Sequence, residues 1–347
     1  MSAILALLVT SVFASQPQLP LPAPGPVPNP GPAAPLGSWK IDRNTISISG
    51  VSSGAYMAVQ MGTAFSKDIS AVASVAGGIY WCSEGDSQKA QSRCMGQPQG
   101  INSEVQIAQA RKLSDEGQID SVTHVGRQKV YIFASPKDSV INPLNSEKLQ
   151  EFYNAFVNPS QVTAEKSVAS AHGFPTLNSG NACGMGFLPW ILKCNFDLAG
   201  EILKSAYGPL QARGSADPKN LFKYSQKEFG DEKTPLYKEG WVYVPQECQQ
   251  GNQCRLHVAL HGCQMNPDFI QDKFVNMGGY NEWAETNRII VLYPQSAKIQ
   301  KDNPYACWDW FGFTGPNYMT KSGAQMTALK SMIERAIQES SRANSAF

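Results

Sequence analysis

Short apolar runs and longer helix-like stretches follow one another along the chain. The short runs are bounded by glycine, proline or polar residues, which is typical of strands. We expect strands at 45–49, 72–76, 129–134, 167–171, 240–245, 255–260 and 288–293. Helices are predicted at 55–65, 103–113, 147–156, 267–287 and 323–340. This alternation predicts an α/β fold in which a mostly parallel central sheet carries helices on both faces.

Two stretches interrupt the alternation. Residues 3–13 form an apolar run that is too short to span a bilayer; small residues follow it, although no Lys or Arg precedes it. Nine prolines fall within residues 16–37, a density that excludes helices and sheet ladders. We therefore expect a signal peptide at 1–15, a Pro-rich disordered leader at 16–38 and a single domain at 39–347. Within that domain, residues 178–234 are predicted to form an insertion over the sheet.

The composition narrows the kind of partner. The chain has 347 residues, of which 42% are hydrophobic and 16% charged, and its net charge is +1. That length is enough for one large domain with a deep core. A near-neutral, charge-poor composition argues against nucleic acid or an anionic membrane as the main partner, and no later segment resembles a membrane span. An uncharged partner is favoured instead.

The cysteines indicate disulfides rather than a metal site. There are eight, an even number, as is typical of proteins from an oxidising compartment. Their spacing favours the local pairs Cys82–Cys94, Cys183–Cys194 and Cys248–Cys254, which leaves Cys263 and Cys307 for each other. Eight cysteines allow about a hundred pairings in all, so other connectivities stay open. Because no Cys-x-x-Cys motif and no Cys/His cluster with zinc spacing is present, we expect no metal and no cofactor.

The most informative motif is Gly50-Val51-Ser52-Ser53-Gly54, which lies between a predicted strand and a predicted helix. A Gly-x-Ser-x-Gly in that context forms the nucleophile elbow of serine hydrolases. The turn is too sharp for side chains beside the serine, and it aims nearby amide N–H groups at a developing oxyanion. An ordinary Gly/Ser loop is the alternative, but the strand-to-helix context favours the elbow.

A serine hydroxyl becomes a good nucleophile when a histidine takes its proton and a carboxylate holds that histidine. Of the four histidines, His257 lies within an apolar strand and His124 in a polar segment, whereas His172 follows a predicted strand. Sites in open α/β sheets form beyond the carboxyl ends of strands, so His172 is the candidate base. Asp138 also follows a buried strand and completes the order Ser, Asp, His that is expected of α/β-hydrolases.

An element that α/β-hydrolases place before the elbow occurs after it in this chain. Only residues 39–46 lie between the proline tract and the elbow region, too few for the strands usually found upstream. A strand followed by His261-Gly262-Cys263, the pattern of an oxyanion loop, appears far downstream instead. We infer a circular permutation of the α/β-hydrolase sheet, which is permissible when native termini lie close together at the surface.

Five segments together resemble extracellular poly(3-hydroxybutyrate) depolymerases. They are the motif at 50–57, the contexts of Asp138 and His172, Leu260-His261-Gly262-Cys263-Gln264, and Cys307-Trp308-Asp309-Trp310-Phe311. The order of the elements is similar to that of the single-domain, circularly permuted kind, and the resemblance covers roughly residues 39–340. The sequence departs from multidomain bacterial relatives in that no linker and separate polymer-adsorbing domain is expected.

The resemblance implies a secreted serine esterase that hydrolyses short-chain polyhydroxyalkanoates. It implies Ser52 as the nucleophile, Asp138 as the orienting acid and His172 as the general base. The amides of Ser53 and Cys263 would form the oxyanion hole, and His261 would shape that loop. We further expect an extracellular location (periplasmic if the source is bacterial), an insoluble polyester surface as partner, no nucleic-acid or membrane partner, and a monomer.

Aromatic residues near the C-terminus are candidates for contact with the substrate, namely Tyr305, Trp308 and Trp310. Large rigid rings give apolar contact at low entropic cost, and a Cys263–Cys307 bridge would bring them beside the oxyanion loop. Alternation along an extended segment would point both tryptophans to one side and Asp309 to the other. Further candidates for adsorption, from the predicted insertion, are Phe187, Leu188 and Trp190. The alternative is that these rings fill the core.

Two other functions fit the same residues. A secreted carboxylesterase for soluble phenolic or acetyl esters would need the same triad, which therefore cannot decide between soluble and polymeric esters. A non-catalytic polymer-adsorbing protein would keep the fold without the reaction. A complete triad together with an oxyanion loop argues against the non-catalytic alternative.

Overall fold

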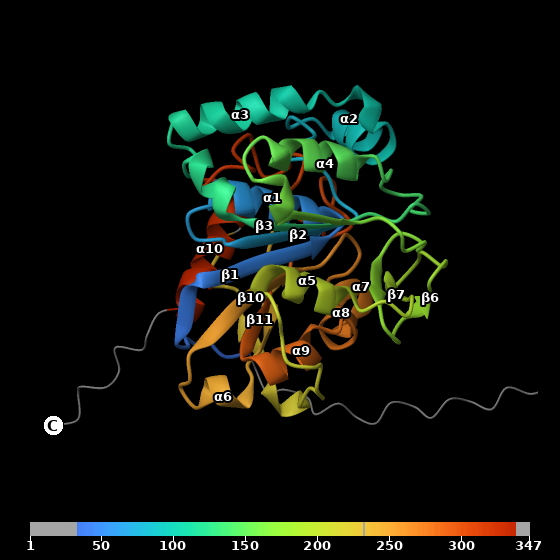
Figure 1. Ribbon diagram of the computed structural model, residues 1–347. Coiled ribbons are helices and arrows are strands. Elements are labelled where there is room, and N and C mark those ends of the chain that lie inside the picture. The colour runs from blue at the N-terminus through green and yellow to red at the C-terminus, as the bar shows by residue number, and fades with distance from the viewer. Residues whose placement is uncertain (1–32, 232, 338–347) are drawn as a thin grey trace, which may run out of the picture. The chain divides into compact units, whose positions relative to one another are not determined.

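A computed structural model describes residues 33–231 and 233–337, and within them an eight-stranded sheet forms the centre (Figure 1). The strand order is β4-β3-β2-β1-β10-β11-β9-β8. The strands are β1 (Ile41–Val51), β2 (Ala71–Val75), β3 (Lys129–Phe133), β4 (Val162–Glu165), β8 (Leu221–Ser225), β9 (Glu239–Tyr243), β10 (Cys254–Leu260) and β11 (Ile289–Tyr293). Neighbouring strands from β4 to β11 run parallel, whereas β9 is antiparallel to both of its neighbours.

The first strand of the described chain lies in the middle of the sheet. β1 pairs with β2 on one side and with β10, which is about two hundred residues later, on the other, with Gly50 opposite both Ser74 and Leu260. Strands of the C-terminal half therefore complete the half of the sheet that usually precedes the nucleophile strand. The predicted circularly permuted α/β-hydrolase sheet is confirmed.

Helices cover both faces of this sheet (Figure 1). On one face lie α1 (Ser53–Ala64), α3 (Ser103–Asp115), α4 (Asn145–Asn154) and α10 (Ala324–Ile337). On the other lie α5 (Leu198–Tyr207), α8 (Lys273–Met277) and α9 (Tyr280–Asn287). Along each central strand the side chains alternate between the two apolar clusters that these helices close, because successive residues of a strand point to opposite faces.

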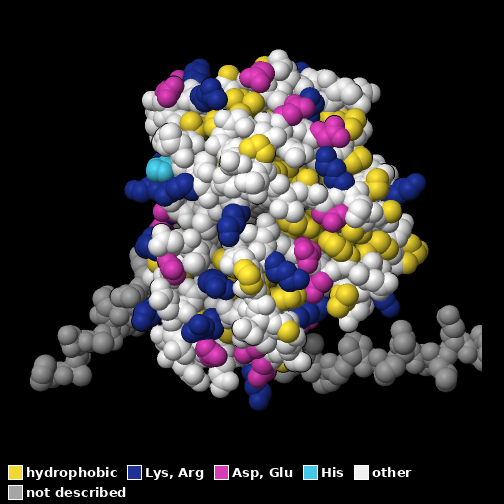
Figure 2. Space-filling model, in the orientation of Figure 1, with side chains coloured by type: hydrophobic (Ala, Val, Ile, Leu, Met, Phe, Trp, Pro, Cys, Tyr) yellow, Lys and Arg dark blue, Asp and Glu magenta, His cyan; other side chains and the backbone are white. Residues whose placement is uncertain are grey.

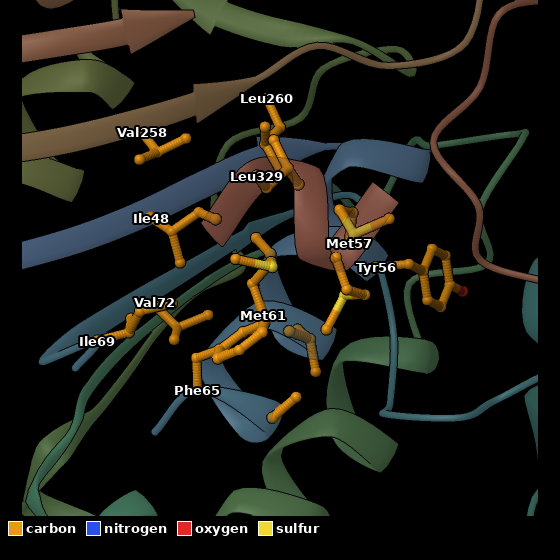
Figure 3. Close-up of a cluster of buried hydrophobic side chains, with 14 of the residues drawn as sticks. Ile48, Tyr56, Met57, Met61, Phe65, Ile69, Val72, Val258, Leu260 and Leu329 are labelled. Atoms are coloured by element: carbon orange, nitrogen blue, oxygen red, sulfur yellow. The ribbon is translucent and has the colours of Figure 1, made fainter. Parts of the chain in front are cut away.

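Helix α1 is buried along its whole length. Figure 3 shows Met61 of α1 and Phe65, which directly follows the helix, pointing toward Val72 and Ile48 of the sheet. Each fully buried side chain of this size contributes about 1.5–3 kcal/mol relative to an exposed one. The elbow that precedes α1 is therefore attached to a helix that is buried at every residue.

A buried polar network lies under β1 and β10. His257 of β10 is hydrogen-bonded through Nδ1 to Ser47 Oγ and through Nε2 to Ser49 Oγ, at 2.7 Å each. The two serines in turn contact the hydroxyls of Tyr207 and Tyr280, also at 2.7 Å. Burial lowers the pKa of His257 to about 3, so the imidazole is neutral near pH 7. The structural role expected of His257 agrees with this environment.

We expect the free energy of unfolding to decrease as the pH falls below about 6.5, the usual pKa of an unfolded histidine. The folded-state pKa of His257 is about 3, so the unfolded chain takes up a proton first and this contribution to stability is lost between those two values. The contribution of His257 makes the free energy of unfolding change by up to ~1.4 kcal/mol per pH unit between these values, and above pH 7 this dependence on pH vanishes. Urea unfolding at pH 5 to 8 measures it. A His257→Gln variant should show a shallower slope, and an unchanged slope would contradict the assignment.

Several predicted elements differ from the structure. The predicted strand at 167–171 is wrong: β4 ends at Glu165, and the following residues leave the sheet because Ser170 and Ala171 bond to Ser135 and Cys183 instead of a neighbouring strand. The single helix predicted at 267–287 consists of α7 (Pro267–Ile270), α8 and α9. It is interrupted where Gln271 and Gly279 have φ of 57° and 89°, which a continuous helix does not allow.

The segment at 178–234 divides between two roles. With the preceding β5 (Phe174–Thr176), its first part forms a small sheet of order β5-β7-β6, from β6 (Asn181–Ala182) and β7 (Ile191–Lys193). The rest is not an insertion, because α5 covers the main sheet and β8 forms its edge. The shorter elements are α2 (Ser87–Lys89), the π-helix η1 (Ala90–Gly96), α6 (Gln246–Gln249) and the 3₁₀ turns η2 (Pro98–Gly100), η3 (Val122–Arg127), η4 (Pro159–Gln161) and η5 (Pro218–Asn220).

The expected signal peptide at 1–15 and most of the leader at 16–38 lie outside the described residues. The last leader residues are described, and they contact the sheet: Ala34 forms a bridge with Tyr224, and Leu36 is buried in the core. The predicted leader boundary at 38 is therefore a few residues too late. In the described ranges, no helix has the length and apolar character needed to traverse a bilayer.

Candidate active site

Ser52 occupies a sharp turn between β1 and α1. Its φ of 57° is unusual for a residue with a side chain, and its hydroxyl does not cap α1. A Cβ at position 50 would lie 2.1 Å from the carbonyl oxygen of Gly54, and one at position 54 would lie 2.3 Å from that of His261. The two glycines are therefore required by close backbone approach, and they leave the Ser52 side chain free at the carboxyl end of the sheet.

Asp138 and His172 are brought together from two loops beyond the carboxyl ends of β3 and β4. His172 Nδ1 lies 2.8 Å from Asp138 Oδ2, and the two side chains are only 8% and 4% exposed. Asp138 Oδ1 accepts the backbone N–H groups of Val140 and Ile141 at 2.8 and 2.9 Å. The carboxylate thus has a fixed orientation, which directs one oxygen to the histidine and leaves His172 Nε2 for other partners.

A cavity of about 1190 Å³ contains both Ser52 and His172 in its lining. Its walls are rich in aromatic residues: Tyr56, Trp190, Tyr305, Trp310, Phe311 and Phe313. Trp190 also meets the His172 ring edge-on, with 5.9 Å between ring centroids. The cavity can therefore bind an apolar chain next to the candidate nucleophile and base. No group of three or more His, Cys, Asp or Glu side chains suited to a metal ion occurs in the described part of the chain.

Ser53 and Cys263, whose backbone amides are the candidates for the oxyanion hole, line the same cavity as Ser52. Ser53 is the first residue of α1, so its N–H has no acceptor within the helix. The Gly262 carbonyl accepts a hydrogen bond from His261 Nδ1 at 2.7 Å. The N–H of Cys263 is part of the same peptide group as this carbonyl. Because the N–H and C=O of a trans peptide point in opposite directions, the Cys263 N–H points away from His261. The pair can donate to an oxyanion at Ser52.

The protonation state of His261 follows from its partners. Its Nε2 accepts the backbone N–H of Ser296 at 3.1 Å, so the ring proton resides on Nδ1. Burial lowers the pKa of His261 to about 4. The neutral ring therefore holds the Gly262 carbonyl at neutral pH, which agrees with the shaping role predicted for it.

Four disulfides are present, and they join the same pairs that the spacing indicated: Cys82–Cys94, Cys183–Cys194, Cys248–Cys254 and Cys263–Cys307. The Cys263–Cys307 bond connects the candidate oxyanion loop to the aromatic segment 306–313. This segment is also tied to α1, because Trp308 N–H donates to Ser53 Oγ at 3.3 Å and Gln60 Nε2 donates to the Asp309 carbonyl at 3.0 Å.

The aromatic segment is not a strand, and the predicted alternation is wrong. The carboxylate of Asp309 is buried and accepts the backbone N–H groups of residues 311 to 314, which folds the segment into a tight turn. Trp308 is fully buried against His261, so its predicted contact with substrate is wrong as well. Trp310 lines the cavity, stacked on Tyr56 at 4.7 Å, and Tyr305 lies at the cavity wall with 54% of its surface exposed.

An exposed apolar patch, defined by Met185, Phe187 and Leu188, lies on the loop between β6 and β7. Phe187 and Leu188 are 49% and 42% exposed. Figure 2 shows hydrophobic side chains gathered on the side of the molecule where Figure 1 places β6 and β7. The Cys183–Cys194 disulfide holds the ends of this loop, and Trp190 at its end lines the cavity. One loop therefore carries both the patch and a residue of the cavity lining.

Some cavity residues were not predicted from the sequence. Tyr56 directs its hydroxyl to the Cys94 carbonyl at 2.6 Å and so joins α1 to the segment at 85–95, of which Met95 lines the cavity. Ile141, close to Asp138, lines it too. Tyr56 stood within the motif that carried the family resemblance, and that position was the available signal. Nothing local in the sequence of 85–95 indicates its place at the site.

Known proteins resemble this chain in sequence and in structure, although no protein-family model matches it. It is 40% identical over 308 residues to "Poly(3-hydroxybutyrate) depolymerase" of Delftia acidovorans, covering 87% of this chain and 62% of that relative. The chain thus spans less than two thirds of that protein's length. It is 33% identical over 322 residues to "Polyhydroxybutyrate depolymerase" of Talaromyces funiculosus, covering 88% of this chain and 93% of the relative.

Two solved structures have the same fold. One is described as the crystal structure of PHB depolymerase from Penicillium funiculosum, and the other as a serine-to-alanine variant of PHB depolymerase complexed with an R3HB trimer. Each has a TM-score of 0.81 and 32% sequence identity, and each match covers 88% of this chain and 99% of the other.

Proposed function

The chain belongs to the polyhydroxybutyrate depolymerase family, and from this premise we propose that it is a secreted serine esterase that hydrolyses the ester bonds of poly(3-hydroxybutyrate) and related short-chain polyhydroxyalkanoates. The observation that carries the proposal is the Asp138–His172 hydrogen bond of 2.8 Å, formed at a cavity that Ser52 also lines.

The proposed reaction proceeds through an acyl-enzyme. Ser52 Oγ attacks the ester carbonyl while His172 Nε2 takes the hydroxyl proton, and Asp138 stabilises the resulting imidazolium. The N–H groups of Ser53 and Cys263 bind the negative oxygen of the tetrahedral intermediate. Collapse of that intermediate breaks the ester C–O bond, and His172 protonates the departing alkoxide. Water, deprotonated by His172, then attacks the acyl-enzyme and releases the acid with Ser52 restored.

The lining of the cavity supports an uncharged, methyl-rich substrate. Trp310, Phe311, Phe313 and the solvent-exposed Tyr305 are all part of the lining. A polyester chain offers ester carbonyls as acceptors and apolar carbon between them, so rings and a few donors suffice to bind it. Among the alternatives, a soluble-ester carboxylesterase would share the reaction, whereas a non-catalytic adsorption protein would have no use for the Asp138–His172 pair.

The test is to compare a polymer with a small ester. We expect the protein to clear a turbid suspension of poly(3-hydroxybutyrate) and to hydrolyse a short p-nitrophenyl ester. Hydrolysis of the soluble ester without clearing would favour the carboxylesterase, and polymer binding without hydrolysis of either would favour the adsorption protein. Secretion and a monomeric state belong to the same proposal; the four disulfides support the former. Cell fractionation and gel filtration test them.

We propose that the patch of Met185, Phe187 and Leu188 adsorbs to the solid polymer. A Phe187→Ala/Leu188→Ala variant is expected to hydrolyse solid polymer at least about tenfold more slowly, since burial of even one of these side chains is worth about 1.5–3 kcal/mol and ~1.4 kcal/mol corresponds to tenfold. Hydrolysis of the soluble ester should change less than about twofold, because remote contacts matter only for the large substrate. Parallel assays of both substrates measure the difference.

A matched control is available at the far edge of the sheet. Phe222 on β8 is 40% exposed, close to the 49% of Phe187, and does not line the cavity. Phe222→Ala should leave both activities unchanged. Adsorption should also persist at high salt, because apolar burial is not screened. Equal losses on both substrates, or adsorption that salt abolishes, would remove the patch from the proposal.

A further inference from the structure

Ser135 lies where β3 and β4 stop pairing. The ladder between these strands ends at Phe133 opposite Glu165, followed by one further backbone bond from Ala134 N–H to the Glu165 carbonyl at 3.0 Å. Beyond that point the chain after β4 leaves the sheet and returns at Ser170. No strand pairing therefore fixes the distance between the two loops that carry Asp138 and His172.

At this position the side chain of Ser135, and not strand pairing, connects the two loops. Its hydroxyl donates to the Ser170 carbonyl at 2.6 Å and accepts the Ser170 N–H at 2.8 Å. It also accepts the N–H of Lys137 at 3.0 Å. A serine hydroxyl has one proton and two lone pairs, so all of its hydrogen-bonding capacity is used. The residue is 1% exposed, and water does not compete for these bonds.

The positions of the two loops thus depend on one side chain, that of Ser135. Asp138 is three residues after Ser135, and its N–H donates to the Ser135 carbonyl at 3.2 Å. His172 is two residues after Ser170. Among the hydrogen bonds of the described residues, the Ser135–Ser170 bonds and the Asp138–His172 bond are those that join the segment 135–142 to the segment 166–173. Without the Ser135–Ser170 bonds, the Asp138–His172 bond is the one remaining hydrogen bond between these two segments of the described chain.

We propose that Ser135 is a positioning residue that sets the Asp138–His172 geometry, an inference that rests on the proposed function. Ser135 does not line the cavity, so it acts only through the loops. Misplacement of a catalytic group by ~1 Å can cost about a hundredfold in rate. The other contacts of the two loops remain in a Ser135 variant, including Ala171 N–H to the Cys183 carbonyl at 2.8 Å, so a smaller loss is expected.

The experiment compares variants of Ser135 and Ser170, the two serines that contact each other. Ser135→Ala removes the hydroxyl, whereas Ser170→Ala keeps the backbone groups that Ser135 binds and removes a hydroxyl that has no partner among the described residues. We expect Ser135→Ala to lower kcat for a soluble p-nitrophenyl ester by about tenfold with KM within about twofold. Ser170→Ala should behave like the unaltered protein. Thermal unfolding checks that both variants are folded.

Two further measurements separate positioning from a general loss of stability. The low-field proton resonance of a histidine N–H bonded to carboxylate should be lost or shifted in Ser135→Ala and kept in Ser170→Ala; its disappearance in His172→Ala assigns it. If Ser135→Ala does not fold, Ser135→Thr and Ser135→Val are compared instead, because Thr and Val have nearly the same shape as each other. Thr keeps the hydroxyl and should retain a kcat about tenfold above that of Val.

The outcomes distinguish this inference from the proposed function. Substantial turnover in His172→Ala would overturn the triad itself. An inactive His172→Ala together with unchanged kcat and an unchanged resonance in Ser135→Ala would overturn the positioning role alone. Equal losses in Ser135→Ala and Ser170→Ala, or equal kcat for the Thr and Val variants, would also overturn it, because the hydroxyl of Ser135 would then not matter.

Discussion

Replacing Ser52 with alanine is expected to lower the rate of ester hydrolysis by about 10⁶-fold, because removal of the nucleophile takes away most of the acceleration of a serine hydrolase. The variant should still fold. Ser52 takes no part in capping α1, and the glycines at positions 50 and 54 that allow the turn remain. Initial rates on a p-nitrophenyl ester, beside a polymer-binding assay, measure both expectations.

The other two residues of the proposed triad give related predictions. Asp138→Asn should cost about 10⁴-fold, because an amide can hold the histidine in the wrong tautomer, and His172→Ala should be impaired at least as much. Binding to the polymer should be unaffected in all three variants, since none of these residues belongs to the exposed patch. Near-normal turnover by the Ser52 variant would refute the nucleophile, and full activity of Asp138→Asn would require another acid.

Removal of the Cys263–Cys307 disulfide is expected to lower kcat by about a hundredfold, the cost of a donor displaced by ~1 Å. The bond joins Cys263, which lines the cavity and whose N–H is proposed for the oxyanion hole, to a segment that Gln60 and Ser53 of α1 bind. A Cys263→Ala/Cys307→Ala variant keeps the backbone N–H but not its tether. Steady-state kinetics on the soluble ester gives the change.

This experiment requires a control for stability, because a bridge that closes a loop of 44 residues stabilises a protein by roughly 4 kcal/mol in the chain-entropy description. Assays well below the unfolding temperature of the variant separate the two effects. Cys248→Ala/Cys254→Ala removes a disulfide between α6 and the start of β10, at a place that does not line the cavity. That variant should keep its kcat within about twofold, and a loss equal to that of the Cys263–Cys307 variant would contradict the argument.

Local patterns in the sequence were sufficient for much of the fold. The central strands are short buried runs with turn residues at their ends, and the position of the His261-Gly262-Cys263 segment after the elbow was enough to predict the permutation. The strand expected at 167–171 fails because its backbone partners are Ser135 and Cys183, which no local pattern reveals. Hydrogen bonds between distant loops are decided by tertiary structure and not by propensity.

In the candidate site, too, local features could be predicted from the sequence and distant contacts could not. The motif around Ser52 and the positions of Asp138 and His172 after buried strands are local features. The assignment of Trp308 to the substrate assumed an extended segment, but the Asp309 carboxylate gathers four backbone N–H groups and turns the chain. The sequence does not distinguish an aspartate with this role from an aspartate on the surface. The wall formed by residues 85–95 depends on Tyr56 and on the Cys82–Cys94 bond, both distant contacts.

The central place of β1 has a consequence for the order in which the protein folds. Ser47 and His257, neighbours across β1 and β10, are 210 residues apart in the chain. During synthesis from the N-terminus, β1 can pair early with β2, but its other edge stays open until β10 emerges. Contacts of such long separation slow folding, and an open strand edge is a template for association with other chains. Until β10 is synthesised, the edge of β1 that β10 covers in the folded protein is therefore open to other chains.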